Sequence, residues 1–307
     1  GEALKKRMEM GFTFLKMDLG IGQLGGEEGT LSAPLGFLES MRGGWHRSTE
    51  GMTPEERRWA RNRWYDAFNV AHPFTGIHIT EKGLDRLEQY VADVRSVIGY
   101  EVPLAVDHFG HIGVEDGIKL AQRIDKYNLA WLEDMVPWQL TDQYVRLAQS
   151  CTTPICTGED IYLKENFLPL LQAGGVSVIH PDILTSGGIL ENKKIGDLAQ
   201  EHGAAMAVHM AETPIACMAA VHSVAATENF LALENHSVDV PWWNELVTGL
   251  PNPIVKDGYI EVPDKPGLGI DELNDEVIKQ HLAPDDPGLW EPTDEWNDDI
   301  VNDRLWS

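Results

Sequence analysis

Three short stretches, Val106-Asp107-His108, Leu132-Glu133-Asp134 and Gly158-Glu159-Asp160, decide the fold that this sequence predicts. Each one places an acidic residue at the end of a short apolar run, and a helical pattern of apolar residues follows each one. Glu133 follows Asp107 by 26 residues, and Glu159 follows Glu133 by the same interval. This interval suits one strand plus one helix, so the pattern predicts consecutive βα units whose acids lie at the same height on parallel strands.

In a closed (β/α) barrel, the C-terminal ends of the strands form the rim where active sites lie. A single acid at a strand end is usually a solvated residue, but three in phase would repel one another. Two unit charges about 4 Å apart interact by roughly 4 kcal/mol at an effective dielectric of ~20. A divalent cation relieves this repulsion, and all-oxygen ligation with open positions suits Mg²⁺. The sequence therefore predicts one Mg²⁺ ion beside Asp107, Glu133 and Glu159.

The rest of the chain continues the alternation of strands and helices, which predicts an α/β fold with a parallel sheet. The expected strands are residues 12–17, 103–106, 129–132, 154–156, 176–179, 204–208 and 230–233. The expected helices are residues 2–10, 84–98, 114–127, 141–150, 164–173, 190–202 and 214–226. An eight-stranded barrel is one strand short in this series, so we expect an N-terminally incomplete (β/α) barrel.

Residues 20–80 interrupt the pattern after the first expected strand. The stretch Thr53-Pro54-Glu55-Glu56 is a capping box with proline at the first helical position, and it predicts a helix to about residue 69. Because the insertion leaves the C-terminal end of a strand, we expect it to overhang the rim as an active-site lid. Each of its candidate substrate contacts is individually more often ordinary loop packing; they are Trp45, His46, Arg47, His72 and His78.

Residues 1–281 form the expected catalytic domain, and residues 282–307 form an acidic tail that carries Trp290, Trp296 and Trp306. A purely disordered segment is usually poor in aromatic residues. We therefore expect the tail to dock on the body of the protein or on a neighbouring subunit.

The net charge of −25 at pH 7 and the pI near 4.7 argue against nucleic-acid and anionic-membrane partners, which need a basic surface. The three cysteines form no CxxC pair, and their odd number favours free thiols in a reducing cytoplasm. No apolar run has transmembrane length. We expect a cytoplasmic homo-oligomer that acts on a small molecule.

Two later strands end in Asp182 and His209, which are expected to be neighbours. A carboxylate that accepts a hydrogen bond from an imidazole fixes its tautomer and raises the basicity of the other ring nitrogen. A lone histidine at a strand end is more often a core residue, but one paired with aspartate beside a metal site is a general-base candidate. Glu234 ends the last strand across the mouth from Lys16. A carboxylate that faces a lysine can be a plain salt bridge, but these two are expected to point into the same pocket.

The set Lys16, Asp107, Glu133, Glu159, Asp182, His209 and Glu234, with Gly187-Gly188 after the aspartate, resembles the barrel of the enolase superfamily, mandelate racemase and acid-sugar dehydratase subgroup. The likeness covers residues 1–269 and includes the closing segment Lys265-Pro266-Gly267-Leu268-Gly269. It implies that Asp107, Glu133 and Glu159 bind Mg²⁺, which holds the substrate carboxylate. It also implies that His209, held by Asp182, removes the α-proton, while Glu234 and Lys16 stabilise the charge that develops. This mechanism is a standard example from that superfamily and does not come from the spacing.

The sequence departs from the family pattern at three points. Lys16-Met17-Asp18 replaces Lys-x-Lys, so the second lysine, which acts as a base on the opposite face, is missing. Phe109 stands where asparagine is common, and His108 or His111 is expected to supply a polar contact instead. The first strand and the N-terminal capping domain of the family are not found in this sequence. The expected substrate contacts are Asp18, His46, His108, His111, Asp160 and His236.

With one clear base, the resemblance implies abstraction on one face followed by loss of a β-hydroxyl group. The favoured function is a Mg²⁺-dependent dehydratase of an aldonate or aldarate that yields a 2-keto-3-deoxy sugar acid. A racemase, epimerase or cycloisomerase acting on a hydroxy acid or its lactone is an open alternative. A catalytically silent barrel that binds sugar acids is the alternative from another class, and the intact ligand set and His-Asp pair argue against it. The sequence does not specify which sugar acid is bound.

Overall fold

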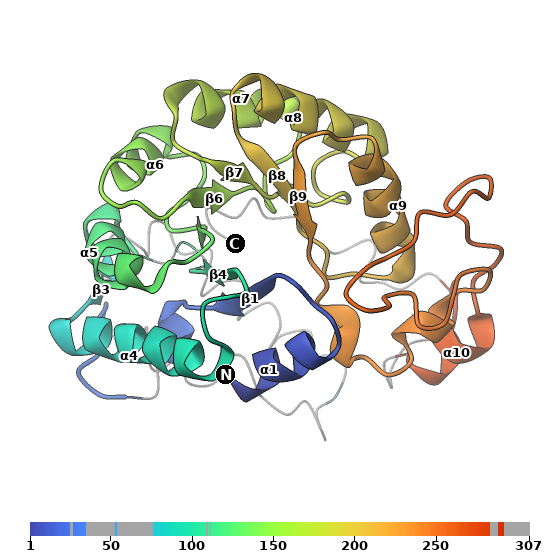
Figure 1. The fold of residues 1–307 in the computed structure, drawn as a ribbon, viewed down its shortest axis with the longest axis horizontal. Helices are drawn as coiled ribbons and strands as arrows, with labels where there is room; N and C mark the ends of the chain where they lie inside the picture. The colour runs from blue at the N-terminus through green and yellow to red at the C-terminus, as the bar shows by residue number, and fades with distance from the viewer. Residues whose placement is uncertain are drawn as a thin grey trace.

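The computed structural model describes residues 1–24, 27–34, 53, 76–108, 110, 112–282 and 288–291. Within these residues, seven strands form one curled sheet with helices around its outside (Figure 1). The strand order β1-β4-β5-β6-β7-β8-β9 follows the chain, and every pair in this sheet is parallel. The predicted fold class, an incomplete parallel (β/α) barrel, is confirmed.

The elements of the curled sheet lie close to their predicted positions. Its strands are β1 (Leu15–Asp18), β4 (Leu104–Asp107), β5 (Leu132–Glu133), β6 (Ile155–Thr157), β7 (Val178–Ile179), β8 (Ala205–Val208) and β9 (Phe230–Leu233). The α-helices are α1 (Glu2–Glu9), α4 (Glu81–Ile98), α5 (Val114–Ile124), α6 (Thr141–Ala148), α7 (Lys164–Ala173), α8 (Ile189–Glu201), α9 (Pro214–Ala225) and α10 (Asp275–Gln280). The 3-10 helices are η1 (Ile21–Gln23), η3 (Asp125–Tyr127), η4 (Ser237–Asp239) and η5 (Trp243–Leu246). β4 and β5 run one residue further than predicted, because the two acids at their ends are themselves paired.

The long helix α4 shows how local sequence sets the helix boundaries. The Thr80 side chain accepts a hydrogen bond from the backbone N–H of Gly83 at 3.1 Å, which caps the first turn. Gly99, with φ +74°, ends the helix in a conformation that glycine adopts at little cost. A Cβ on Gly83 would lie 2.2 Å from the carbonyl oxygen of Thr30, so only glycine permits α4 to pack this closely.

Side chains alternate between the two faces of each strand. On β4, Leu104 and Val106 join the large core between the sheet and the helices, whereas Ala105 belongs to a separate cluster inside the barrel with Trp131 and Cys156. This second cluster makes the interior of the barrel a packed apolar layer.

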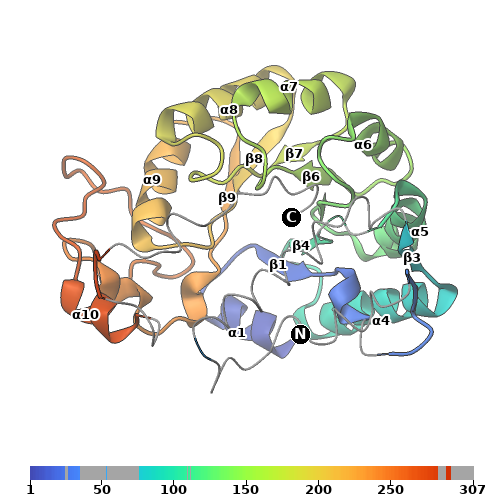
Figure 2. The ribbon, with the colours of Figure 1, turned by 180° about the vertical axis from the view of Figure 1, so that it is seen from behind.

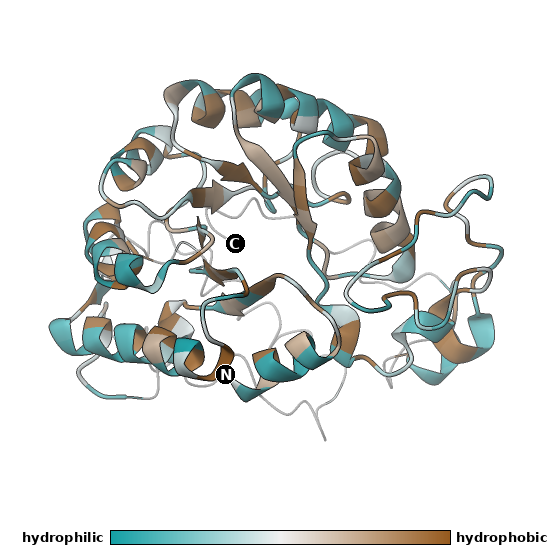
Figure 3. Ribbon diagram, viewed as in Figure 1, coloured by the Kyte–Doolittle hydropathy of each residue, from teal (hydrophilic) through white to brown (hydrophobic). Residues whose placement is uncertain are grey.

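The outer helices carry both hydrophilic and hydrophobic stripes (Figure 3), as expected of helices buried on one side.

On six of the seven strands of the curled sheet, the inward-facing position two residues further along the strand changes from apolar to polar. Phe14, Ala105, Trp131 and Val178 belong to the interior cluster, and the residue two positions after each of them is charged or polar. Because strand side chains repeat with a period of two, these residues form the next layer toward the rim. On six strands this layer consists of Lys16, Asp107, Glu133, His180, His209 and Glu234.

β1 and β9 are the two edges of the curled sheet, and within the described residues no other strand pairs with either edge. They lie at the two ends of the arc of strands, with α1 beside β1 (Figures 1 and 2). A cavity of about 240 Å³ occupies this seam, lined by Leu4, Phe14 and Leu15 on one side and by Ala232 and Leu233 on the other. The predicted gap in the barrel is thus present, between the first and last strands of the sheet.

Several predictions concern residues outside the described ranges. The predicted lid helix after Thr53 lies outside them, as do Trp45, His46, Arg47, His72, Phe109, His111, Trp296 and Trp306. The described part of the insertion contains η1 and an antiparallel pair, β2 (Leu31–Ser32) and β3 (His78–Ile79). Trp290 in the tail is 70% exposed, so it does not pack on the described body of the protein.

All three cysteines are free, as predicted, and two of them are buried. Among the described residues, none of the helices combines the length and apolar character needed to cross a bilayer.

Candidate active site

Asp107, Glu133 and Glu159 each place a carboxylate oxygen within 4.8 Å of the other two. Asp107 and Glu133 are register partners on β4 and β5. The partner of Glu133 on β6 is Cys156, so Glu159 lies further along the chain than a strand residue at that height would. The prediction that all three acids occupy equivalent strand positions is therefore wrong for Glu159, although all three meet.

Gly158 explains how Glu159 joins the other two acids from beyond the end of β6. A Cβ at this position would lie 2.7 Å from the backbone nitrogen of His180, so a larger residue would push the β6 loop away from the neighbouring strand. With glycine there, the chain stays close to β7, and the next side chain reaches the acids of β4 and β5.

Burial and crowding make this acidic cluster favour positive charge. Burial raises the pKa of Asp107 to about 6, because the charges of Glu133 and Glu234 add to an effect that Lys16 only partly offsets. Burial and the charge of Asp107 raise the pKa of Glu159 to about 8. Asp107 and Glu159 thus hold protons that a cation would replace. Glu133 differs, because the effect of burial on its pKa is outweighed by the charges of His180 and Lys16, which lower this pKa to about 2.

Lys16 supplies one such positive charge. Its Nζ lies 2.9 Å from Glu133 Oε1, 3.0 Å from Asp107 Oδ2 and 3.2 Å from Glu234 Oε1. Burial lowers the pKa of Lys16, but the surrounding carboxylates outweigh this effect and raise it well above its usual value. The ammonium group therefore stays charged and bridges the two edges of the sheet.

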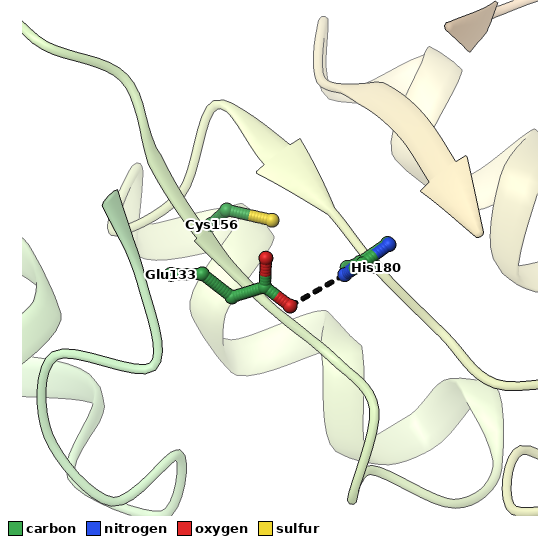
Figure 4. A group of neighbouring side chains, drawn as sticks. All are labelled: Glu133, Cys156 and His180. Atoms are coloured by element: carbon green, nitrogen blue, oxygen red, sulfur yellow. Dashed lines mark hydrogen bonds and ion pairs between the residues drawn. The ribbon is translucent and has the colours of Figure 1, made fainter. Parts of the chain in front are cut away.

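Glu133 has further partners that the sequence analysis did not identify. The ring of His180 donates from Nδ1 to Glu133 Oε1 at 2.5 Å, and Trp131 Nε1 donates to Glu133 Oε2 at 2.8 Å. Figure 4 shows His180 and Cys156 beside Glu133, reaching it from the two following strands. The period-two alternation was the available signal, because Trp131 lies two positions before Glu133 and His180 lies two positions after the inward-facing Val178.

His209 and Asp182 form the predicted pair. The ring donates from Nδ1 to Asp182 Oδ2 at 2.7 Å, and Asp182 Oδ1 accepts from the backbone N–H groups of Leu184 and Thr185. The other ring nitrogen, Nε2, lies 3.4 Å from Glu159 Oε2 and so faces the acidic cluster. Burial lowers the pKa of His209, but the hydrogen bond to Asp182 and the charges of Glu159 and Glu234 raise it to about 9.

Glu212 is a second residue that the sequence analysis missed, three positions after His209. Its carboxyl group is hydrogen-bonded to Asp182, and burial together with this contact raises the pKa of Glu212. Its backbone carbonyl accepts from Ser237 Oγ at 3.0 Å and from Trp243 Nε1 at 2.8 Å. Glu212 therefore packs its carboxyl group against Asp182, the residue that orients the ring of His209.

Glu234, His236 and Asp18 form the mouth of the site at the seam. His236 Nε2 lies 2.7 Å from Glu234 Oε1, and the His236 ring centroid lies 5.8 Å from that of His209. Burial raises the pKa of Asp18, although the charges of His236 and Lys16 oppose the rise. Asp18 and His236, both predicted substrate contacts, are thus electrostatic neighbours.

The remaining predicted contacts lie elsewhere. The ring of His108 is fully buried, with Nδ1 3.1 Å from the carbonyl oxygen of Leu19, and burial lowers its pKa to about 4. His78 is exposed, with Nδ1 3.0 Å from Asp116 Oδ2. Asp160 is half-buried next to Glu159. A substrate contact by any of them stays a prediction.

The donor set of the acidic cluster fits a hard divalent ion. It offers carboxylate oxygens from three residues, and Mg²⁺ prefers such ligands. Glu133 Oε2 accepts a single described hydrogen bond, from Trp131, and a carboxylate oxygen has two acceptor sites.

A family model described as "Enolase C-terminal domain-like" matches residues 53–277 of the chain. D-xylonate dehydratase from Haloferax volcanii is 35% identical over 207 residues, which are 67% of this chain and 49% of that protein. D-galactonate dehydratase from Ralstonia pickettii is 32% identical over 216 residues, which are 68% of this chain and 56% of that protein. The chain thus spans about half the length of these curated relatives.

A solved structure with the same fold is a mandelate racemase/muconate lactonizing enzyme-like protein from Rubrobacter xylanophilus. The two chains are 28% identical with a TM-score of 0.72, and the match covers 94% of this chain and 61% of that one. The open barrel described above therefore has a close structural counterpart.

Proposed function

The chain belongs to the enolase C-terminal domain-like family, and on that premise we propose that it is the barrel of a Mg²⁺-dependent acid-sugar dehydratase. The observation that carries the proposal is the His209–Asp182 pair, whose free nitrogen faces the carboxylate cluster. Relatives named D-xylonate and D-galactonate dehydratase support an aldonate as the substrate. Residues 1–281 would be the catalytic domain of a cytoplasmic homo-oligomer, with residues 20–80 as its lid and 282–307 as its tail.

An α-proton beside a carboxylate is a very weak acid, because its removal places a second negative charge on the same group. In this site, Asp107, Glu133 and Glu159 would hold Mg²⁺, which supplies positive charge to the substrate carboxylate. Lys16 adds a fixed cation at the same point, and preorganised charges of this kind are usually the largest contribution to catalysis. Glu234, held by Lys16, would contact the carboxylate oxygen that gains charge.

His209 would remove the proton through Nε2. Asp182 fixes the proton on Nδ1, so Nε2 carries a lone pair toward the substrate whenever the ring is neutral. The pair of electrons left on the α-carbon then forms a double bond to the β-carbon as the β-hydroxyl group departs. The resulting enol becomes a 2-keto-3-deoxy acid, and the overall change is the loss of one water molecule.

The proposal is tested by incubating the purified protein with D-xylonate, D-galactonate and a library of other sugar acids, followed by a colour reaction for 2-keto acids. We expect a product that requires Mg²⁺ and is lost in excess chelator. Full activity in chelator would contradict the metal assignment. Epimerised acid without any keto product would replace the dehydratase by a racemase or epimerase.

A further inference from the structure

Loss of a β-hydroxyl group needs a proton donor as well as a base. Hydroxide is a poor leaving group, and a positioned acid that protonates it typically contributes about 10² to 10⁴ in rate. His209 takes the α-proton in the proposed reaction, so a second group must deliver a proton to the leaving oxygen or His209 must do both. The described residues around Nε2 of His209 show which side chain is placed for this task.

His236 stands beside His209 at the mouth of the site. One donor atom each from His209, Glu234 and His236 lie within 4.8 Å of one another. The side chain of His236 is 52% exposed, whereas that of His209 is 15% exposed, so the first lies nearer to solvent than the second. Glu234 fixes the ring of His236 through a contact of 2.7 Å to Nε2.

We propose that His236 is the catalytic acid that protonates the departing β-hydroxyl group. This assignment rests on the proposed dehydratase function and adds the residue for its second step. The base must reach the α-proton, and the acid must reach the oxygen on the β-carbon, each over about 3 Å. The two nitrogens must then lie roughly 4–6 Å apart. One ring nitrogen of His236 lies within 4.8 Å of a ring nitrogen of His209, which agrees with this requirement.

The other acids of the site are placed less well. The carboxyl group of Glu212 is hydrogen-bonded to Asp182, which in turn bonds Nδ1 of His209, so Glu212 is engaged with the partner of the base. Lys16 contacts three carboxylates and lies where the substrate carboxylate is expected, so it is not placed beside the β-hydroxyl group. Asp18 lies close enough to His236 for their charges to interact, which makes it a partner of this ring.

The step balances without an added reagent. The electrons of the broken α C–H bond form the π bond of the new double bond between the α- and β-carbons, and the electrons of the β C–O bond leave with the oxygen. That oxygen takes a proton from the His236 imidazolium and departs as water. His209 ends protonated and His236 ends neutral, and exchange with solvent restores both rings.

The test compares His236→Gln with the wild-type protein on D-xylonate and D-galactonate, and on their 3-deoxy-3-fluoro analogues. We expect elimination of water to fall about 10²- to 10⁴-fold in the variant, while the α-proton still exchanges with D₂O at a rate similar to wild-type turnover. Fluoride leaves without full protonation, so the fluoro analogue should recover most of the lost rate. His202→Gln, at an exposed position after α8, is the matched control and should behave as wild type.

Wild-type elimination of water by His236→Gln would overturn the assignment of His236 alone. So would loss of α-proton exchange, or an equal loss of rate on the fluoro analogue, because both would place His236 in a step other than leaving-group protonation. A wild-type protein that eliminates water from neither aldonate would overturn the dehydratase proposal, and the assignment would fall with it. Thermal unfolding of each variant shows whether the fold is retained.

Discussion

Lys16 Nζ lies 3.2 Å from Glu234 Oε1, so the first and last strands of the open sheet meet through an ion pair. The same ammonium group lies within 3.0 Å of both Asp107 and Glu133. One cation thus serves three buried acids from β4, β5 and the end of β9. Glu133 has a further partner in His180 and Glu234 has one in His236, so Lys16 is the cation that all three acids share.

Replacing Lys16 with methionine should destabilise the metal-free protein strongly. Removal of one partner from a buried ionic cluster typically costs about 3–5 kcal/mol, because the remaining charges stay buried without compensation. Lys279→Met is the matched control, since both members of its pair with Glu276 are exposed and such surface pairs contribute about 0–1 kcal/mol. Denaturant unfolding in chelator measures both effects. Equal losses in the two variants would show that Lys16 does not hold the cluster together.

Stability of the metal-free protein should fall as the pH rises from about 5 to 9. The folded-state pKa values of Asp107, Glu159 and His209 are all raised, to about 6, 8 and 9. A raised pKa gives stability that is present below the unfolded-state value and lost as the pH passes the folded-state value. Mg²⁺ would replace the protons on Asp107 and Glu159, so its stabilising effect should grow with pH. Thermal unfolding at pH 5.5 and 8.5, with and without Mg²⁺, checks this; equal stabilisation at both pH values would contradict it.

Glu133→Gln should abolish metal binding and turnover. The amide keeps the volume and can still accept from Trp131 Nε1, but it removes the charge that a divalent ion requires. Its NH₂ group then faces Lys16 and the ring of His180, so some loss of stability accompanies the change. We expect metal affinity to fall by at least about 100-fold, since even changes to groups that only support metal ligands cost about 10- to 100-fold. Mn²⁺ binding followed by electron paramagnetic resonance measures this directly. Glu115→Gln is the matched control, because Glu115 is an exposed acid paired with Arg146, and this variant should bind Mn²⁺ as the wild type does.

Arg95 should be a purely structural residue of the helix layer. Its buried guanidinium donates to the carbonyl oxygens of Gly99, Val102, Tyr127 and Asn128, which join the end of α4 to the turn after α5. Arg95→Lys leaves some of these carbonyls without a donor and should cost about 2–4 kcal/mol in unfolding free energy, with kcat unchanged. Arg86→Lys on the exposed face of α4 is the control. A change in kcat without loss of stability would contradict this role.

The sequence alone predicted the parts of this protein that follow from repetition. Apolar runs that end in an acid predicted the strands, and the even interval predicted that Asp107 and Glu133 are neighbours, as their register confirms. The same interval misplaced Glu159, because Gly158 lets the chain leave β6 before the acid is reached. The number of residues between two positions does not show where the backbone changes direction.

The partners of the site residues were harder to predict, because they depend on contacts between distant residues. His180 and Glu133 are 47 positions apart, and only the curl of the sheet brings the ring to the carboxylate. Glu212 looks like an ordinary loop acid until the hydrogen bond to Asp182 is seen. His108 follows a site acid directly and yet is buried against Leu19, since adjacent residues on a strand face opposite sides.

His209→Asn should stop both product formation and exchange of the α-proton with D₂O, because the two begin with the same abstraction. Asp182→Asn should be milder, with a loss of about 10² to 10⁴ in rate, since the ring remains but loses the partner that fixes its tautomer. The measurement is proton NMR of sugar acids of both C2 configurations incubated with each variant in D₂O. In a two-base racemase, one epimer would still exchange through a group on the opposite face when His209 is gone. Retained exchange of either epimer in His209→Asn would therefore reveal a second base and would move the assignment from dehydratase to racemase or epimerase.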